Sequence, residues 1–462
     1  MAKKKILLLS DDMRLHSGVG TVSKEFVRQT IGEFDWVQLG GAIKHPEEGK
    51  VVDLSAEFAK ETQVKDASCK IYPVSGYGNG MLLRQILSME KPDAILHFTD
   101  PRFWIWLYQM EHEIRQNIPL MFYTIWDDMP FPRWNEPYYE SCDQLMCISK
   151  QTTNIVRNVV RDYPKEDWQI NYVPHGINED IFYPINNSHE SYGKYLSFRD
   201  SILQDRDPEF IIFWNNRNIR RKGPGDLILA YAKFVSSLPQ EKQDKILLLL
   251  HTDPVDDNGT DIPAVVKELC PYNVAFTGRK VNESEMNYLY NMSDVTVNIA
   301  SNEGFGLSGA ESLMAGTPII NNVTGGLQDH CGFVNDDGEL ITVDDFSAEW
   351  GSNHDKRYLK CGKWAKPVFP SNRSLQGSPA TPYIFDDRCK FEHVAERMKE
   401  WYNVSPEERI ECGLEGRKYV TNPAVGMGAT EMGKRFIKYI NMTLEKWQPR
   451  KKHLLYKVGE QI

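Results

Sequence analysis

The sequence predicts an α/β protein made of two doubly wound domains. Apolar runs without polar alternation recur along the chain, and amphipathic stretches of helical length separate them. Such runs are typical of parallel strands that helices cover on both faces. The pattern restarts after a polar segment near 186–207, and the whole length suits two domains of roughly 200 residues each. Because ligands of such sheets bind at the carboxyl ends of the strands, we expect a ligand cleft between the domains.

The first domain is predicted to span residues 1–190 and the second residues 205–424. Strands are expected in the first domain at 5–10, 93–98, 119–126 and 144–149. Strands are expected in the second domain at 210–216, 245–251, 273–278, 295–301 and 317–322. Residues 332–385 are rich in Gly, Pro, Asn, Asp and Ser, so we expect a functional insertion or a mobile loop there. Residues 425–462 hold a last amphipathic helix and a basic tail.

Composition narrows the class of protein. Apolar residues make up 41% and charged residues 26%, which is typical of a soluble globular chain. No apolar run approaches the ~20 residues that span a bilayer, and the run in "MAKKKILLLSDD" is too short for a signal peptide. The eight cysteines form no C-x-x-C, so we expect reduced thiols in the cytoplasm and no structural zinc site. The net charge of -10 gives no global attraction to nucleic acid, although a local basic groove stays possible.

The stretch "SNEGFGLSGAESLMAGTPII" (301–320) imitates the dinucleotide pattern G-x-G-x-x-G. That fingerprint belongs at the first βα turn, whereas these glycines follow a late strand, and the neighbouring glutamates would repel a pyrophosphate. We interpret the stretch as a loop-to-helix junction, with Glu303 in the loop and Glu311 one turn into a helix that begins near Ser308. Carboxylates and free helix amides together suit a polyol such as a sugar or a ribose. The alternative is a tight turn with both glutamates in solvent.

Two other loops favour a phosphate ligand. Arg217 and Lys222, in "NNRNIRRKG", follow the first strand of the second domain and can reach a diphosphate. Gly18 and Gly20, in "LHSGVGTVSKEF", follow the first strand of the first domain and allow close backbone approach. The alternatives are a solvated basic turn and an ordinary βα turn that needs glycine.

A third loop, "YTIWDDMPFPRW" (123–134), follows an apolar strand whose end should face the cleft. Asp127 or Asp128 could accept a proton or bind the hydroxyl of an acceptor. A helix cap or a surface turn is an equally good interpretation of these two carboxylates.

Together these motifs resemble the retaining nucleotide-sugar glycosyltransferases of the GT-B fold, in their glycogen-synthase- and mannosyltransferase-like branch. Glu303 and Glu311 have the spacing of the E-x7-E motif of that family. The family pattern continues through "FTGRKVNESEMNYLYNMSDVTVNIASNEGFGLSGAESLMAGTPIINNVTGG", and "YVPHGINEDIFYP" (172–184) resembles the segment before the second domain. The resemblance is specific over about 170–330. It implies two Rossmann-like domains with an interdomain cleft and a C-terminal helix, about 425–447, that crosses back to the first domain.

The resemblance also implies roles for single residues. Arg217 and Lys222 hold the donor diphosphate, Glu311 binds the ribose, and Glu303 binds the transferred sugar. The donor-binding set that it implies is Gly18, Gly20, Arg279, Gly304, Phe305, Gly306, Leu307 and Glu311. The catalytic set adds Asp127 to Arg217, Lys222 and Glu303.

One position departs from the family pattern. The family often has a His after the strand that here ends in "YTIW", and Trp126 stands in its place. His97, at the end of another strand, is a candidate to replace it. The acceptor-side candidates are therefore Trp126, Asp128, His97 and Arg133.

The expected reaction is transfer from a nucleoside diphosphate sugar, UDP-linked, with retention at the anomeric carbon. The sequence has no DxD-like motif in a convincing position, so we expect neither a metal nor a cofactor. Segments such as "GGAIKHPEE" and "CGKWAKPVFP" resemble glycosyltransferases of tailed bacteriophages, some of which glycosylate hydroxymethylated cytosine in phage DNA in the host cytoplasm.

The first expectation for the acceptor is therefore 5-hydroxymethylcytosine in phage duplex DNA. This acceptor requires a flipped base and a basic path, for which Arg102, Arg133 and the tail 450–452 are candidates. A small-molecule, glycan or protein acceptor, a GT-B binding protein without catalysis, and a nucleotide-sugar epimerase stay open as alternatives.

Overall fold

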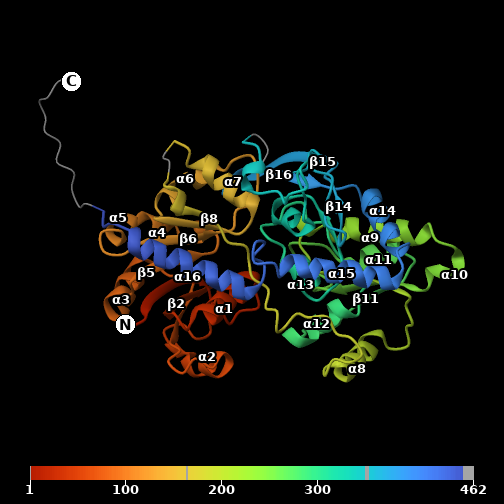
Figure 1. Cartoon of the computed structure of the whole chain (residues 1–462), viewed down its shortest axis with the longest axis horizontal. Helices are drawn as coiled ribbons and strands as arrows, with labels where there is room; N and C mark the ends of the chain where they lie inside the picture. The colour runs from red at the N-terminus through yellow and green to blue at the C-terminus, as the bar shows by residue number, and fades with distance from the viewer. Residues whose placement is uncertain (1, 163–164, 349–352, 451–462) are drawn as a thin grey trace, which may run out of the picture.

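The computed structural model describes residues 2–162, 165–348 and 353–450, which form two α/β domains side by side (Figure 1). The N-terminal domain is built on an eight-stranded sheet in the order β3-β4-β2-β1-β5-β6-β7-β8, in which all pairs but β3–β4 are parallel. Its strands are β1 (Lys4–Asp11), β2 (Phe34–Ala42), β3 (Val52–Asp53), β4 (Cys69–Ser75), β5 (Ala94–Phe98), β6 (Leu120–Thr124), β7 (Gln144–Cys147) and β8 (Ile170–Tyr172). Its α-helices are α1 (Gly18–Thr30), α2 (Ser55–Thr62), α3 (Gly80–Glu90), α4 (Ile105–Gln109), α5 (Glu111–Ile114), α6 (Glu136–Glu140) and α7 (Lys150–Val159).

The C-terminal domain has a six-stranded parallel sheet in the order β11-β10-β9-β12-β13-β14. Its strands are β9 (Phe210–Asn215), β10 (Ile246–His251), β11 (Val274–Phe276), β12 (Val295–Asn298), β13 (Ile319–Asn322) and β14 (Ala365–Val368). Its α-helices are α8 (Tyr192–Leu203), α9 (Pro224–Ser236), α10 (Gln240–Gln243), α11 (Ile262–Leu269), α12 (Glu283–Asn291), α13 (Leu307–Met314), α14 (Phe391–Tyr402) and α15 (Pro406–Val420). The fold class predicted from the apolar runs is therefore confirmed.

Every strand predicted from the sequence is present, with ends shifted by a few residues. In the two large sheets, the strands β2, β3, β4, β8 and β14 were not predicted. Gly40 and Gly41 lie in β2, Pro73 in β4 and Pro367 in β14, and these residue types weaken the strand signal. The sheet tolerates Pro367 because β14 is its edge strand.

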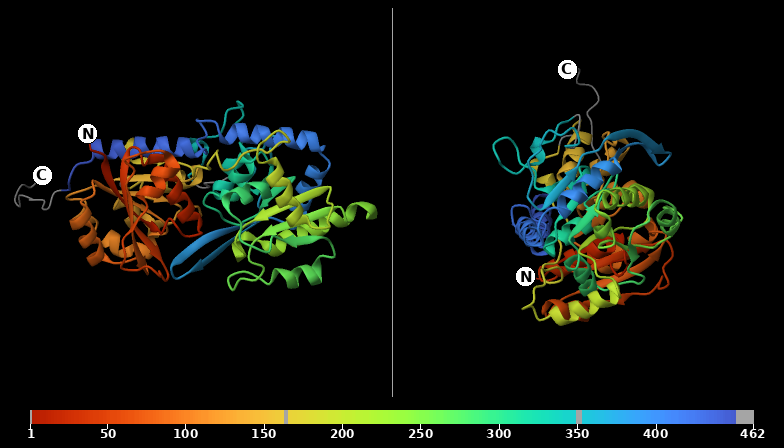
Figure 2. Two further views of the ribbon diagram at one scale, coloured as in Figure 1. Left: turned by 90° about the horizontal axis from the view of Figure 1, so that it is seen from below. Right: turned by 90° about the vertical axis from the view of Figure 1, so that its right-hand side faces the viewer.

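The segment 332–385 is neither a simple insertion nor one long loop. Its strand β14 pairs with β13 and completes the sheet of the C-terminal domain. Its end belongs to a hairpin of β15 (Asn372–Ser378) and β16 (Thr381–Arg388), which extends from the C-terminal domain toward the N-terminal one (Figure 2, left). Residues 349–352 lie outside the described part of the chain.

The last helix, α16 (Ala429–Lys446), returns to the N-terminal domain and lies along α1 (Figure 1). Phe436 of α16 is fully buried, and its ring stacks on Phe26 of α1 with centroids 4.6 Å apart. Gly433 lets the two helices approach, since a Cβ atom there would lie 2.6 Å from Cβ of Gln29. The α16 helix therefore joins the C-terminal end of the chain to the core of the first domain.

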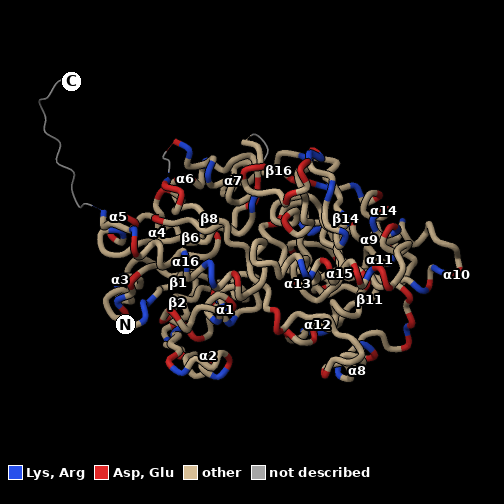
Figure 3. The backbone as a smooth tube through the Cα atoms, in the orientation of Figure 1, with Lys and Arg blue, Asp and Glu red and all other residues tan. Residues whose placement is uncertain are grey.

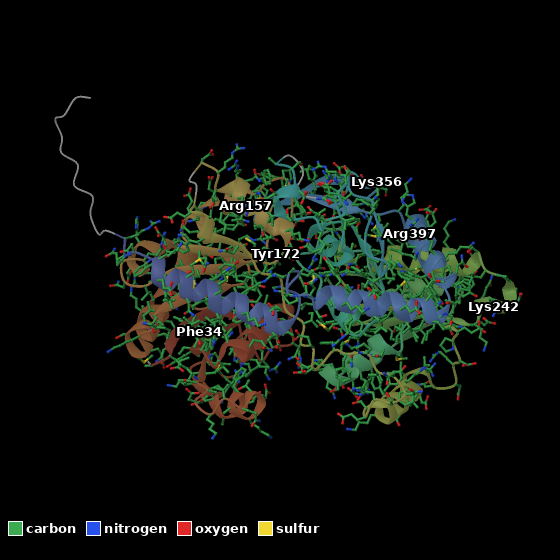
Figure 4. The ribbon with its side chains drawn as sticks, viewed as in Figure 1. Phe34, Arg157, Tyr172, Lys242, Lys356 and Arg397 are labelled. Carbon is green, nitrogen blue, oxygen red and sulfur yellow. The ribbon has the colours of Figure 1, made fainter. Side chains whose placement is uncertain are left out.

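Polar contacts also link the domains. The hydroxyl of Tyr172 donates to Asp329 Oδ2 at 3.2 Å, and the amide of Lys150 donates to the same oxygen at 3.0 Å. Arg157 Nη1 lies 2.7 Å from Asp344 Oδ1, and both Arg157 and Tyr172 are labelled in Figure 4. These contacts hold the sheets with their carboxyl ends facing one another. Among the described residues, no helix has the length and apolar character to cross a membrane.

The α1–α16 interface gives a stability prediction. Phe436→Ala removes a fully buried ring, so the free energy of unfolding of the N-terminal domain should fall by about 3–5 kcal/mol. Urea denaturation followed by circular dichroism measures this change. Lys438→Ala, an exposed position on the same helix, is the control and should stay within about 0.5 kcal/mol of the wild type. Equal stability of both variants would contradict the packing role of α16.

Candidate functional site

The two domains enclose a cleft of about 910 Å³ at the carboxyl ends of their strands. The N-terminal domain and the segment after β8 contribute a group of side chains from loops that follow β1, β5, β6 and β8. This group includes Gly18, Asp100, Arg102, Trp126, Asp127, Asp128 and His175. The C-terminal domain contributes Asn215, Arg217, Arg221, Lys222, Glu303, Gly304, Phe305, Gly306, Leu307, Ser308 and Glu311. Most residues that the sequence singled out thus lie around one cavity.

A cluster of cations follows β9. The 3₁₀ turn η4 (Arg220–Lys222) places Lys222 inside the cleft, where its ammonium contacts Glu303 Oε2. Arg221 Nη1 donates to the carbonyl of Asn302 at 2.7 Å and lies 3.4 Å from Glu303 Oε2. Arg217 is 64% exposed and pairs with Asp256 at 3.0 Å. Three positive side chains therefore converge here, of which Arg217 is held only by an exposed pair.

The glycines around Glu303 allow the two domains to approach. A Cβ atom on Gly304 would lie 2.9 Å from Cδ1 of Ile148 and 3.0 Å from the carbonyl of Ile125, both in the N-terminal domain. Gly306 has a φ of 84°, in the left-handed region, and forms the N-cap of α13. We expected these glycines to bring the backbone close to a ligand. In the structure Gly304 lines the cleft, and protein fills the space where its Cβ atom would lie, so this glycine also lets the two domains pack against each other.

Glu311 lies in the same cleft, and its carboxyl group accepts a hydrogen bond from a neighbouring tyrosine. Tyr290 Oη donates to Glu311 Oε2 at 2.6 Å, and Asn215 Nδ2 donates to Tyr290 Oη at 2.9 Å. Burial raises the pKa of Glu311 to about 7, against the lowering effect of the Tyr290 hydrogen bond. The Asn215–Tyr290–Glu311 chain fixes the carboxylate orientation and leaves its second oxygen available as an acceptor.

Two neighbouring carboxyl groups lie at the opposite side of the cleft, in the loop after β6. Burial raises the pKa of Asp127 to about 6, and burial together with Asp127 raises the pKa of Asp128 well above its ordinary value. The indole of Trp126 donates to the carbonyl of Asp128 at 2.9 Å, which fixes the turn. Among the described residues, no group of three His, Cys, Asp or Glu side chains could hold a metal ion.

Several residues of the cleft were not predicted, and Arg221 and His175 are two of them. The sequence did not single out Arg221, because it is one of three consecutive basic residues and the prediction used only the spacing from Arg217 to Lys222. His175, in the segment after β8, lies against Phe305 with ring centroids 5.0 Å apart. Burial lowers the pKa of His175 to about 3, so the imidazole is neutral. Tyr123 Oη lies 2.7 Å from His175 Nδ1 and donates to the carbonyl of Val173 at 2.9 Å.

Two predicted donor-binding residues lie elsewhere. Gly20 is absent from the lining; it lies inside α1, where a Cβ atom would come 2.6 Å from the carbonyl of Leu15. The turn between β1 and α1 therefore requires a glycine at this position. Arg279 lies outside the cleft and pairs with Glu285 at 2.7 Å on the surface. By contrast, a Cβ atom on Gly18 would contact Leu307 Cδ1 at 3.6 Å, so Gly18 marks the approach of the two domains.

Two acceptor-side candidates also lie away from the cleft. His97 is fully buried below the sheet, stacked on Phe122 and 2.7 Å from Tyr108 Oη. Side chains alternate along a strand, so Phe98, not His97, faces the cleft. Arg133 donates to the carbonyl of Val159 at 2.7 Å and does not line the cleft.

The basic residues proposed for a nucleic-acid path are already paired. Arg102 contacts Asp100 and donates to the carbonyl of Ala380 at 3.0 Å. Arg450 pairs with Glu111 at 3.1 Å, and residues 451–462 lie outside the described part of the chain. Lys and Arg are interspersed with Asp and Glu over both domains (Figure 3). Among the described residues these positions give no continuous basic path.

Two doubly wound domains with a cleft between facing strand ends define the GT-B fold of glycosyltransferases, and solved structures agree. The chain superimposes on sucrose-phosphate synthase from Thermosynechococcus elongatus with a TM-score of 0.65 at 16% identity, over 96% of this chain and 100% of the other. It superimposes on HepE of Anabaena in complex with UDP and glucose with a TM-score of 0.62 at 10% identity, over 95% and 100% of the two chains.

Residues 197–342 match the family model of glycosyl transferases group 1. The chain is 27% identical over 192 residues to alpha-monoglucosyldiacylglycerol synthase of Acholeplasma laidlawii, which is 40% of this chain and 43% of that protein. It is 30% identical over 196 residues to an uncharacterized glycosyltransferase of Methanocaldococcus jannaschii, 41% and 45% of the two chains. The match therefore spans less than half the length of these relatives.

The buried carboxyl group of Glu311 gives a prediction of pH dependence. Its pKa is near 7 in the folded protein and 4.5 in a model peptide, so the folded state holds the proton more tightly. This contribution to stability is present below about pH 4.5 and is lost as the pH rises to 7. Glu311→Gln should therefore reduce the fall of the melting temperature between pH 5 and pH 8, as measured by differential scanning fluorimetry. An unchanged pH profile would contradict the raised pKa.

Proposed function

We propose that this protein is a retaining glycosyltransferase that uses a nucleoside diphosphate sugar. The observation that carries the proposal is the convergence of Arg217, Arg221 and Lys222 with Glu303 and Glu311 around one interdomain cleft. The match of residues 197–342 to group 1 glycosyltransferases supports it. UDP is the nucleotide that we propose, because the structural neighbour HepE was solved with UDP and with UDP-glucose.

In this proposal the diphosphate of the donor is bound by the cations that follow β9. Phosphate oxygens accept from Lys222, Arg221 and, once it leaves Asp256, Arg217. Glu311 accepts from the ribose hydroxyls, with its carboxylate oriented by Tyr290. Because Lys222 contacts Glu303, its transfer to the diphosphate frees Glu303 to accept from the hydroxyls of the sugar. One exchange of partners thus prepares both subsites.

The transfer step breaks the bond between the anomeric carbon and the diphosphate oxygen. The acceptor oxygen forms its bond on the same face, and its proton passes to the leaving phosphate, so no protein base is required. Negative charge grows on the diphosphate in the transition state, where fixed donors and cations stabilise it. Asp127 and Asp128 lie in the cleft lining and orient the acceptor hydroxyl.

The acceptor that we propose is a hydroxylated molecule without phosphate groups near the transfer point. The carboxyl groups of Asp100, Asp127 and Asp128 line this side of the cleft, where they can exchange hydrogen bonds with hydroxyl groups and offer no cation to a phosphate. 5-Hydroxymethylcytosine in phage DNA, which the sequence resemblance suggests, is the competing acceptor. Assays with both kinds of acceptor distinguish these two proposals.

Substitution of Lys222 or Arg217 tests whether the cations of the cleft bind the donor diphosphate. Lys222→Ala should lower the rate of donor turnover by about 10²–10³-fold, because one fixed charge at a developing anion contributes about that much. Arg217→Ala should change the rate in the same direction. The measurement is release of the nucleoside diphosphate in a coupled assay. Arg220→Ala, an exposed residue of the same turn outside the cleft lining, is the matched control and should stay close to the wild type. Unchanged activity of Lys222→Ala would refute the assignment.

A panel of substrates tests the reaction. UDP-, GDP- and ADP-linked sugars are incubated with neutral sugars and glycosides or with duplex DNA containing 5-hydroxymethylcytosine, and products are found by mass spectrometry. We expect transfer from a UDP-sugar to a neutral hydroxylated acceptor, with the anomeric configuration of the donor retained in the NMR spectrum. The rate should be equal with Mg²⁺ and with EDTA, since protein cations supply the charge. A mass shift on the DNA, with no product from any neutral acceptor, would contradict the proposed acceptor and favour 5-hydroxymethylcytosine.

A further inference from the structure

The β15–β16 hairpin is a feature that the donor-binding reaction leaves without a role. It follows the edge strand β14 and extends across to the N-terminal domain, on the side of the molecule opposite α16 (Figure 2, left). Thr381 and Ile384, both on β16, line the cleft together with the loop that holds Asp127 and Asp128. The hairpin therefore closes the cleft at the end where the acceptor is expected.

The base of the hairpin is fixed to the loop that carries Glu303. Ser301 Oγ donates to Asp386 Oδ1 at 2.5 Å, and the amide of Asp387 donates to the carbonyl of Ser301 at 3.0 Å. Thr324 Oγ1 donates to Asp387 Oδ2 at 3.0 Å. Because Ser301 is two residues from Glu303, the hairpin cannot shift at its base without moving the sugar-binding loop.

The β16 strand docks on the N-terminal domain. The amide of Phe385 donates to the carbonyl of Met129 at 2.6 Å, and Tyr383 Oη donates to the carbonyl of Phe131 at 3.1 Å. The ring of Tyr383 packs edge-on against Trp134, with centroids 4.3 Å apart. These contacts are made with the segment directly after Asp127 and Asp128.

The turn of the hairpin is held by Arg102. This guanidinium, fixed by Asp100, donates to the carbonyl of Ala380 and to Thr381 Oγ1. Its carbon also lies 5.5 Å from the centre of the Trp126 ring. Arg102 thus joins the wall of the cleft in the first domain to the hairpin of the second.

We propose that the β15–β16 hairpin is the acceptor wall of the cleft, with Thr381 and Ile384 as specificity-determining residues and with Tyr383 and Arg102 as positioning residues. This inference rests on the proposed function. The wall limits which molecules reach the anomeric carbon, and it excludes water from a reactive donor. One end of the hairpin is fixed to the loop that would bind the sugar, and its other end is fixed to the loop that would bind the acceptor. The hairpin therefore keeps these two loops at a constant position relative to each other.

The alternative is a strut that holds the domains together and touches no substrate. A strut would change stability and donor binding alike when weakened. An acceptor wall instead predicts a specific change in the use of acceptor and water, at an unchanged KM for the donor.

The test compares Tyr383→Ala and Arg102→Ala with the wild type. For each protein we measure the hydrolysis rate of the UDP-sugar without acceptor, and the KM for donor and for the acceptor found in the panel. We expect the hydrolysis rate and the acceptor KM to rise by about tenfold, the effect of one lost positioning contact of ~1.4 kcal/mol. The double variant should change less than the product of the single changes, because both residues hold the same hairpin.

Gln376→Ala is the matched control, since Gln376 is an exposed residue of β15 that donates to Ser374 on its own strand. Tyr383→Phe, which keeps the ring on Trp134 and removes the hydroxyl, should give a smaller change in the same direction and guards against misfolding of the alanine variant. Equal hydrolysis and acceptor KM in Tyr383→Ala, Arg102→Ala and Gln376→Ala would overturn the wall. If the wild type neither hydrolyses nor transfers any sugar of the panel, the proposed function itself fails.

Discussion

The close contact between the loop 301–306 and the N-terminal domain is the constraint on which the cleft depends. A Cβ atom on Gly304 would lie 2.9 Å from Cδ1 of Ile148 and 3.0 Å from the carbonyl of Ile125, closer than ordinary van der Waals contact. The ends of β6 and β7 therefore rest directly on the segment that carries Glu303. A larger residue at 304 would have to displace Ile148 and the chain at Ile125, which lies two residues before Asp127.

Charge inside the cleft is arranged as exchangeable pairs. Lys222 and Arg221 both contact the carboxylate of Glu303, and Arg217 pairs with Asp256. A buried pair is costly to break unless a new partner replaces the lost one. A diphosphate supplies such a partner for the cations, and sugar hydroxyls supply donors for the carboxylate. The site therefore favours a ligand that carries both groups at once and gives little to phosphate or sugar alone.

Much of the fold followed from the sequence because buried parallel strands have a strong apolar signal. Part of the cleft lining followed as well, since Glu303, Glu311, Arg217 and Lys222 come from segments that follow strands at the same sheet edge. Other placements depend on information that spacing does not hold. His97 lies on the wrong face of β5, because a shift of one residue reverses the direction of a side chain.

The hairpin was beyond prediction for a different reason. The β15 strand is largely exposed and β16 is mostly half-buried, so neither has the apolar alternation that marks a strand, and the docking partners of the hairpin are distant in the sequence. Arg102 looked like a residue for a nucleic-acid backbone until its partners in the hairpin were known. A charged side chain at a cleft is thus ambiguous until the element opposite it is placed.

The connections between the domains restrict how the cleft can move. At one side the chain crosses twice, at 175–178 and 427–429, and these segments pair through Ile177 and Gly428. Gly176 permits that pairing, since a Cβ atom there would lie 2.6 Å from Cα of Ala429. Noncovalent contacts also join the domains: the hairpin docks on residues 129–134, and α7 contacts Asp329 and Asp344. Because the covalent crossings cannot separate, any rotation that opens the cleft about them must release these contacts, those of the hairpin included. The contacts that shape the proposed acceptor wall are therefore among the contacts that resist opening.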